Sequence, residues 1–260
     1  MPCASRVTPP AGMIAGVPRR GRTVNPLRPS ELGRQEELAY SLWLPERSEP
    51  AFGGVVILHG AGSCKESHHD FARACVAIGL AAVAFDQRGH GKSAGAMNDR
   101  ALDDVADITA LLRDRAGRPD LPVALRGSSM GGYIAILAAP WAGARAVVAI
   151  CPASAEGLRR GLASGAFDFE ADEEALERFL TGQELEPAVE ALEVPLLLLH
   201  AEGDEQVPVE HSRELAQRMH APGSRLITVP GGHHRSVQHD PELRAISLRW
   251  IERALRSGAH

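Results

Sequence analysis

The sequence predicts an α/β fold in which helices cover both faces of a mostly parallel central sheet. Two observations carry this prediction. From Leu38 onward, short apolar runs alternate with segments whose apolar residues recur at helical spacing. Most of these runs are mainly apolar and do not alternate with polar residues, which is typical of strands that are buried on both sides. We therefore expect one such domain over residues 26–260.

The strands are expected where the apolar runs occur. In chain order they cover residues 39–44, 55–59, 81–85, 122–126, 146–151, 195–200 and 225–229. Amphipathic helices are expected between and after the strands. Their apolar stripes are formed by Phe71, Cys75 and Ile78, by residues 131–139, and by Leu243, Ile246, Trp250 and Ile251.

Residues 154–192 interrupt the alternation with a polar, partly helical insertion. Asp172 is a good N-cap for a helix, and Leu176, Phe179 and Leu180 fall on one face of it. We expect this insertion to form a small cap over the sheet. Its apolar residues are candidates for an acyl or aryl ester pocket, but no single substrate-contacting residue is indicated.

Residues 1–25 hold arginines, prolines and glycines and no acidic residue. An organelle transit peptide has a similar composition, whereas a secretory signal requires a longer apolar core than residues 13–17 provide. We expect a disordered N-terminal tail.

The composition excludes several classes of function. The chain of 260 residues is 44% hydrophobic and 23% charged, which is typical of a globular protein. Its formal charge of −5 gives no reason to expect nucleic acid as a partner. The most apolar stretch, residues 127–144, contains Gly131, Gly132 and Pro140, so neither a membrane span nor a membrane partner is expected.

The four cysteines are scattered and form no C-x-x-C pair, which favours reduced thiols in a cytoplasm and no structural metal site. His68, His69 and Asp70 are adjacent on an expected helix and point in different directions, so they do not predict a metal site either. The sequence does not indicate an oligomeric state.

The segment Gly127-Ser128-Ser129-Met130-Gly131 fits the pattern G-x-S-x-G between an expected strand and an expected helix. Small residues on both sides of a serine permit a sharp turn that exposes its hydroxyl at the start of the helix. Ser129 is therefore a candidate nucleophile. The alternative is a tight glycine-rich turn without chemistry.

A serine hydroxyl requires a base and an acid to become a nucleophile. Asp204 follows one expected strand, and His233 and His234 follow the next. The carboxyl ends of parallel strands meet at one edge of the sheet, so these side chains are expected near Ser129. Glu202 is an alternative acid.

With these motifs the sequence resembles the α/β-hydrolase superfamily over residues 38–256. His59-Gly60-Ala61-Gly62 is similar to its oxyanion loop, residues 85–93 to its D-x-R-G-x-G-x-S segment, and residues 203–208 to its G-x-D-x-x-V-P acid loop. The chain looks like a small esterase of the dienelactone-hydrolase type or a prolyl-oligopeptidase-like catalytic domain.

The resemblance implies a serine hydrolase that forms an acyl-enzyme. Ser129 would attack a carbonyl, a histidine would accept and return its proton, and Asp204 would orient that histidine. The N–H groups of Ala61 and Met130 would bind the oxyanion. No metal or organic cofactor is implied. The expected substrate is a small-molecule carboxylic ester, with a thioesterase, a peptidase or a non-catalytic binding module as alternatives.

The doublet His233-His234 leaves the base open, since only one imidazole can face Ser129. Related small esterases read G-x-x-H here, and alignment of Gly231 with that glycine favours His234.

Overall fold

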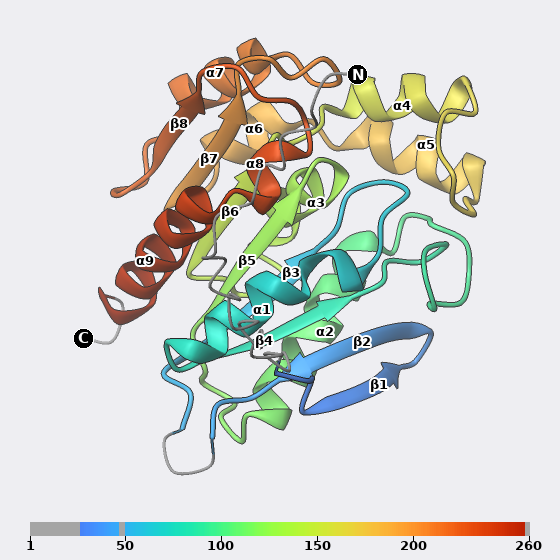
Figure 1. The fold of residues 1–260 in the computed structure, drawn as a ribbon. Coiled ribbons are helices and arrows are strands. Elements are labelled where there is room, and N and C mark those ends of the chain that lie inside the picture. The colour runs from blue at the N-terminus through green and yellow to red at the C-terminus, as the bar shows by residue number, and fades with distance from the viewer. Residues whose placement is uncertain (1–26, 47–49, 258–260) are drawn as a thin grey trace, which may run out of the picture.

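The computed structural model describes residues 27–46 and 50–257 (Figure 1). Eight strands form one sheet in the order β1-β2-β4-β3-β5-β6-β7-β8. Only the pairs β1/β2 and β2/β4 are antiparallel, and all others are parallel. The strands are β1 (Glu31–Gln35), β2 (Leu38–Trp43), β3 (Gly53–Leu58), β4 (Leu80–Phe85), β5 (Val123–Ser128), β6 (Ala146–Ile150), β7 (Leu196–Ala201) and β8 (Arg225–Val229).

Helices cover both faces of this sheet, so the predicted fold class is confirmed. The helices are α1 (His69–Ala77), α2 (Ala101–Arg115), α3 (Met130–Ala138), α4 (Ala155–Ala163), α5 (Glu173–Gly182), α6 (Leu185–Glu190), α7 (Val209–Arg218), α8 (Ser236–His239) and α9 (Pro241–Ser257). One apolar core lies beneath α1 and α9 and contains Phe71 and Ile251. The other lies beneath α2 and α3 and contains Ile108 and Tyr133.

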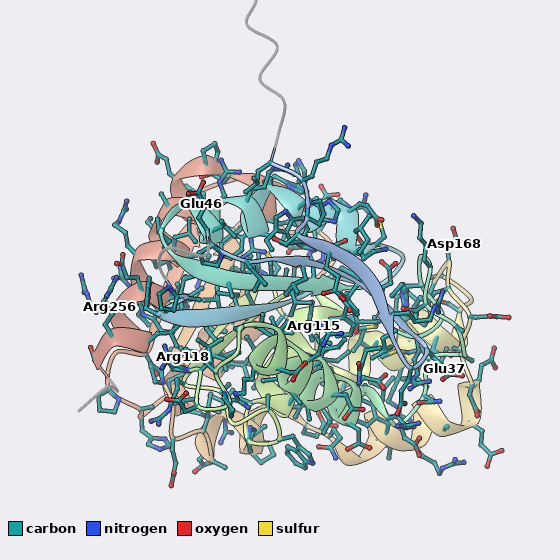
Figure 2. The ribbon with its side chains drawn as sticks, turned by 90° about the horizontal axis from the view of Figure 1, so that it is seen from below. Glu37, Glu46, Arg115, Arg118, Asp168 and Arg256 are labelled. Atoms are coloured by element: carbon teal, nitrogen blue, oxygen red, sulfur yellow. The ribbon has the colours of Figure 1, made fainter. Side chains whose placement is uncertain are left out.

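The seven expected strands all form, with ends that differ by at most two residues, and β1 is an addition that the apolar runs did not indicate. Its sequence, ELGRQ, alternates between half-buried and exposed residues because β1 is an antiparallel edge strand with one face toward solvent. Arg115 of α2, which Figure 2 labels, pairs with Glu31 on the half-buried face of β1.

The predicted insertion, residues 154–192, contains α4, α5 and α6. Asp172 caps α5 as expected, since its side chain accepts a hydrogen bond from the N–H of Ala175. Phe179 and Leu180 of α5 are buried against the core that also holds Tyr133. Figure 1 shows α4 and α5 side by side at the upper right, next to α3.

The expected tail, residues 1–25, lies outside the described residues. Within the part of the chain that the structure describes, no helix combines the length and the apolar character needed to cross a bilayer.

Candidate active site

Ser129 lies in the sharp turn between β5 and α3. Its backbone has φ 53° and ψ −120°, a left-handed conformation that costs about 1–3 kcal/mol for a residue with a side chain. The turn closes tightly, because a Cβ atom at Gly127 would overlap the backbone of Gly131, and one at Gly131 would overlap the carbonyl of His59. The N–H of Ser129 donates to the carbonyl of Ile150 at 2.9 Å, which ties the turn to β6.

Asp204 and His234 form a hydrogen-bonded pair behind Ser129. His234 Nδ1 lies 2.7 Å from Asp204 Oδ2. An ionised carboxylate only accepts hydrogen bonds, so Nδ1 carries the proton and Nε2 is left with its lone pair. Ser129 and His234 line the same cavity.

The Asp204 carboxylate is held as an anion. Its Oδ1 accepts the N–H groups of Gln206 and Val207, both at 2.9 Å. Burial acts to raise the pKa of Asp204, but the hydrogen bonds from His200, from His234 and from these two N–H groups outweigh it and hold the pKa well below its ordinary value. The group is therefore charged at neutral pH and can stabilise a positive imidazolium next to it.

The two alternatives to this pair lie elsewhere. Glu202 is bound to Arg213 and Thr228 on the surface. His233 is exposed, and its N–H donates to Ser236 Oγ at 2.9 Å.

The two N–H groups expected to bind an oxyanion flank Ser129. Met130 is the first residue of α3, where backbone N–H groups have no partner within the helix. Ala61 lies in the loop after β3, and Gly60, Ala61 and Gly62 all line the cavity with Ser129. A Cβ atom at Gly60 would lie 3.1 Å from Ser129 Cβ, so this loop runs directly against the serine.

His59 anchors the start of this loop. The N–H of Gln87 donates to its Nε2 at 3.0 Å, so Nδ1 carries the proton and donates to the carbonyl of Gly60 at 2.8 Å. Burial is the main reason that its pKa is lowered to about 4. His59 is therefore neutral and fixes the backbone next to Ala61.

A buried ion pair anchors the end of the loop. Lys65 Nζ lies 2.5 Å from Asp86 Oδ2, and both side chains are at most 3% exposed. Asp86 also accepts the N–H groups of Lys65 and Lys92. Burial acts to lower the pKa of Lys65, but the contacts with Asp86 and then with Glu66 outweigh it and raise the pKa.

Replacement of Lys65 by methionine is expected to lower the free energy of unfolding by about 3–5 kcal/mol, because it leaves the Asp86 charge buried without its partner. Chemical denaturation measures this effect. Glu66→Gln is the control, since Glu66 also lies 3.0 Å from Lys65 Nζ but is 45% exposed, and its loss is expected to cost less than about 1 kcal/mol. Equal small losses in both variants would contradict a structural role for the ion pair.

The cavity has a volume of about 810 Å³ and is bounded by α4, α7 and α8. Much of its wall is polar and includes Arg160, Gln206, His211 and Gln238. Asp168 also lines it and lies at the periphery of the molecule, so the cavity reaches the surface (Figure 2).

A second, entirely apolar slot of only about 10 Å³ lies beside Met130, and Tyr133, Phe169 and Phe179 also line it. Leu158 and Phe167 line both the slot and the cavity. The slot has room for about one water molecule, so the larger cavity is the space open to a substrate at Ser129.

The structure thus brings together Ser129, Asp204, His234, Ala61 and Met130, all of which the sequence singled out. His200 and Lys65 were missed. His200 Nε2 donates to the carbonyl of Val207 at 2.9 Å and supports the Asp204 loop. The only sequence signal for it is a histidine inside an apolar strand, four residues before the acid.

Comparison with known proteins identifies the family of this chain. The family model described as "Serine aminopeptidase, S33" matches residues 49–167 and 173–242. A monoacylglycerol lipase of Mycolicibacterium smegmatis is 28% identical over 253 residues, which cover 80% of this chain and 89% of that protein.

Two solved structures share the fold. The monoacylglycerol lipase of Paleococcus ferrophilus has a TM-score of 0.63 at 22% identity and covers 85% of this chain and 99% of its own. Est1E of Butyrivibrio proteoclasticus, with bound ferulic acid, has a TM-score of 0.63 at 23% identity and covers 86% and 96%. The chain belongs to the serine aminopeptidase S33 family, and it is a serine hydrolase with the α/β-hydrolase fold.

Proposed function

We propose that the protein, an ester-cleaving serine hydrolase, acts on esters that join a short or medium acyl group to a small polar alcohol such as glycerol. One observation carries the proposal: Ser129 lies at a strained turn in the same cavity as His234, whose Nδ1 is bound to Asp204.

The proposed reaction assigns a role to each group. Ser129 Oγ attacks the ester carbonyl while His234 Nε2 takes its proton, and Asp204 stabilises the imidazolium that forms. The N–H groups of Ala61 and Met130 bind the oxyanion of the tetrahedral intermediate. His234 then returns the proton to the departing alcohol, and water releases the acid by the same steps in reverse.

The shape of the site supports the substrate class. The polar cavity of about 810 Å³ fits a hydroxylated leaving group. The neighbouring apolar slot has a volume of only about 10 Å³, which is too small for an acyl chain. The acyl group must therefore share the cavity with the leaving group, which favours a short one. The similarity to two monoacylglycerol lipases supports a glycerol ester.

Initial rates with butyryl, octanoyl and palmitoyl glycerol test this proposal. We expect kcat/KM to fall from butyryl or octanoyl to palmitoyl, and we expect each glycerol ester to exceed the methyl ester of the same acid. In Phe167→Ala, the ratio of octanoyl to butyryl turnover is expected to rise by about tenfold, because the slot opens.

The matched thioesters and anilides separate ester cleavage from the related activities. Faster cleavage of thioester or anilide than of ester would contradict the proposal, as would equal rates with methyl and glycerol esters.

A reducing cytoplasm is the proposed location. Cys64, Cys75 and Cys151 are free thiols in the described part of the chain, which supports it.

A further inference from the structure

A buried cysteine lies next to the Asp204–His234 pair. Cys151 directly follows β6 and is 1% exposed. Asp204 follows β7 and His234 follows β8, and these three strands are neighbours in the sheet. The pairing of Ile150 with Leu199 brings the ends of β6 and β7 together, so all three side chains meet at one edge.

The ligand atoms of the three residues converge. Cys151 Sγ, a carboxylate oxygen of Asp204 and a ring nitrogen of His234 all lie within 4.8 Å of one another. A tetrahedral zinc ion with bonds of about 2.0–2.3 Å separates its ligand atoms by about 3.3–3.8 Å. Small side-chain movements are sufficient to reach that geometry.

The three donor atoms determine which metal ions this group can bind. Sulfur, imidazole nitrogen and carboxylate oxygen form the donor set of Zn²⁺ and of its larger, softer analogue Cd²⁺. Mg²⁺ and Ca²⁺ require six or more oxygen ligands, which this group does not provide. His234 lines the cavity, so an ion can enter from it and keep a water molecule in the fourth position.

We propose that Cys151, Asp204 and His234 bind a thiophilic divalent cation, Zn²⁺ or Cd²⁺, and that this binding reversibly inhibits the enzyme. The inhibition rests on the proposed function, because it acts on the same imidazole. The ion replaces the hydrogen bond between Asp204 Oδ2 and His234 Nδ1, which is 2.7 Å long without it.

Binding moves protons in a defined way. The Cys151 thiol releases its proton to solvent and binds as thiolate. The ion occupies the lone pair of His234 Nδ1, so the imidazole proton is relocated to Nε2. An Nε2 that already carries a proton cannot accept one from Ser129, and the reaction stops at its first step.

The Asp204 loop can remain in place during this change. Its other oxygen, Oδ1, stays bound to the N–H groups of Gln206 and Val207. The inhibition is therefore expected to reverse on addition of a chelator, without refolding.

The test uses the full chain with Cys3 and Cys64 replaced by serine, so that Cys151 and the buried Cys75 are the remaining thiols. Stoichiometric Cd²⁺ is added without substrate, and the ultraviolet charge-transfer absorption of a Cd²⁺–thiolate bond is recorded. We expect this absorption in the parent and its loss in Cys151→Ala and Cys151→Ser, whereas Cys75→Ser retains it.

Ester hydrolysis with Zn²⁺ provides the second measurement. We expect chelator-reversible inhibition of the parent, no effect of equal Mg²⁺, and an inhibition constant at least about tenfold weaker in both Cys151 variants. Thermal melts confirm that these variants are folded.

Two results would overturn the proposal: a Cd²⁺–thiolate absorption that is absent from the parent or unchanged in the Cys151 variants, or equal inhibition of parent and variants. The absorption needs no turnover, so failure of the proposed function is distinguishable from failure of the metal site.

Discussion

Replacement of Ser129 by alanine is expected to lower kcat at least about 10⁴-fold and to abolish labelling by a fluorophosphonate probe. The geometry gives the reason. Ser129 is the residue at which the chain holds the left-handed conformation between β5 and α3, in the cavity that His234 also lines. Alanine removes the attacking oxygen and leaves the oxyanion N–H groups in place, so only the small residual catalysis of binding and orientation remains.

Ser128→Ala is the matched control for this experiment. Ser128 is the neighbouring serine, lines the same cavity and is 5% exposed, but it is the last residue of β5 and not the turn residue. We expect this variant to retain labelling. Labelling that persists in Ser129→Ala and disappears in Ser128→Ala would show that Ser128 is the nucleophile and would contradict the assignment of Ser129.

The fold was predictable because it depends on patterns that lie close together in the chain. Strand 146–150 is apolar throughout, and 196–201 is apolar except for His200, since helices cover both of their faces. This signal is visible within six residues. β1 was missed for the opposite reason. An edge strand with one face toward solvent needs few apolar residues, so ELGRQ carries no such signal.

The proposed catalytic residues were predictable because each lies at the carboxyl end of a strand within a short motif. The residues that hold them were not. Lys65 and Asp86 are 21 residues apart in the sequence, so their ion pair could not be predicted from either residue. It forms only in the fold, where Asp86 at the end of β4 lies next to Lys65 in the interior. Cys151 looked like an ordinary apolar residue at the end of a strand, because its neighbours Asp204 and His234 come from two later loops.

The shape of the substrate space was the least predictable part. Leu176, Phe179 and Leu180 of the insertion were expected on one face of a helix, and all three are buried. Their sequence could not show that Leu158 and Phe167 line both a large polar cavity and a small apolar slot, since that depends on how α4 and α5 pack near α3.

Replacement of His234 by alanine is expected to lower kcat at least about 10³-fold, with little change in KM, because the base that accepts the Ser129 proton is lost while the cavity remains. Steady-state hydrolysis of a short p-nitrophenyl ester measures this. The His234 imidazole is oriented by its 2.7 Å contact with Asp204, so the loss of the ring also leaves that carboxylate without the nearer of its two histidine partners.

His233→Ala is the sharpest control, because it removes the same ring one residue earlier in the same turn. His233 is exposed, and the hydrogen bonds of its backbone with Ser236 remain in the variant. We therefore expect kcat within about threefold of wild type, because the substitution is at the surface and removes no buried contact. An inactive His233→Ala beside an active His234→Ala would require the turn to reverse which imidazole faces Asp204, and the base assigned here would then be wrong.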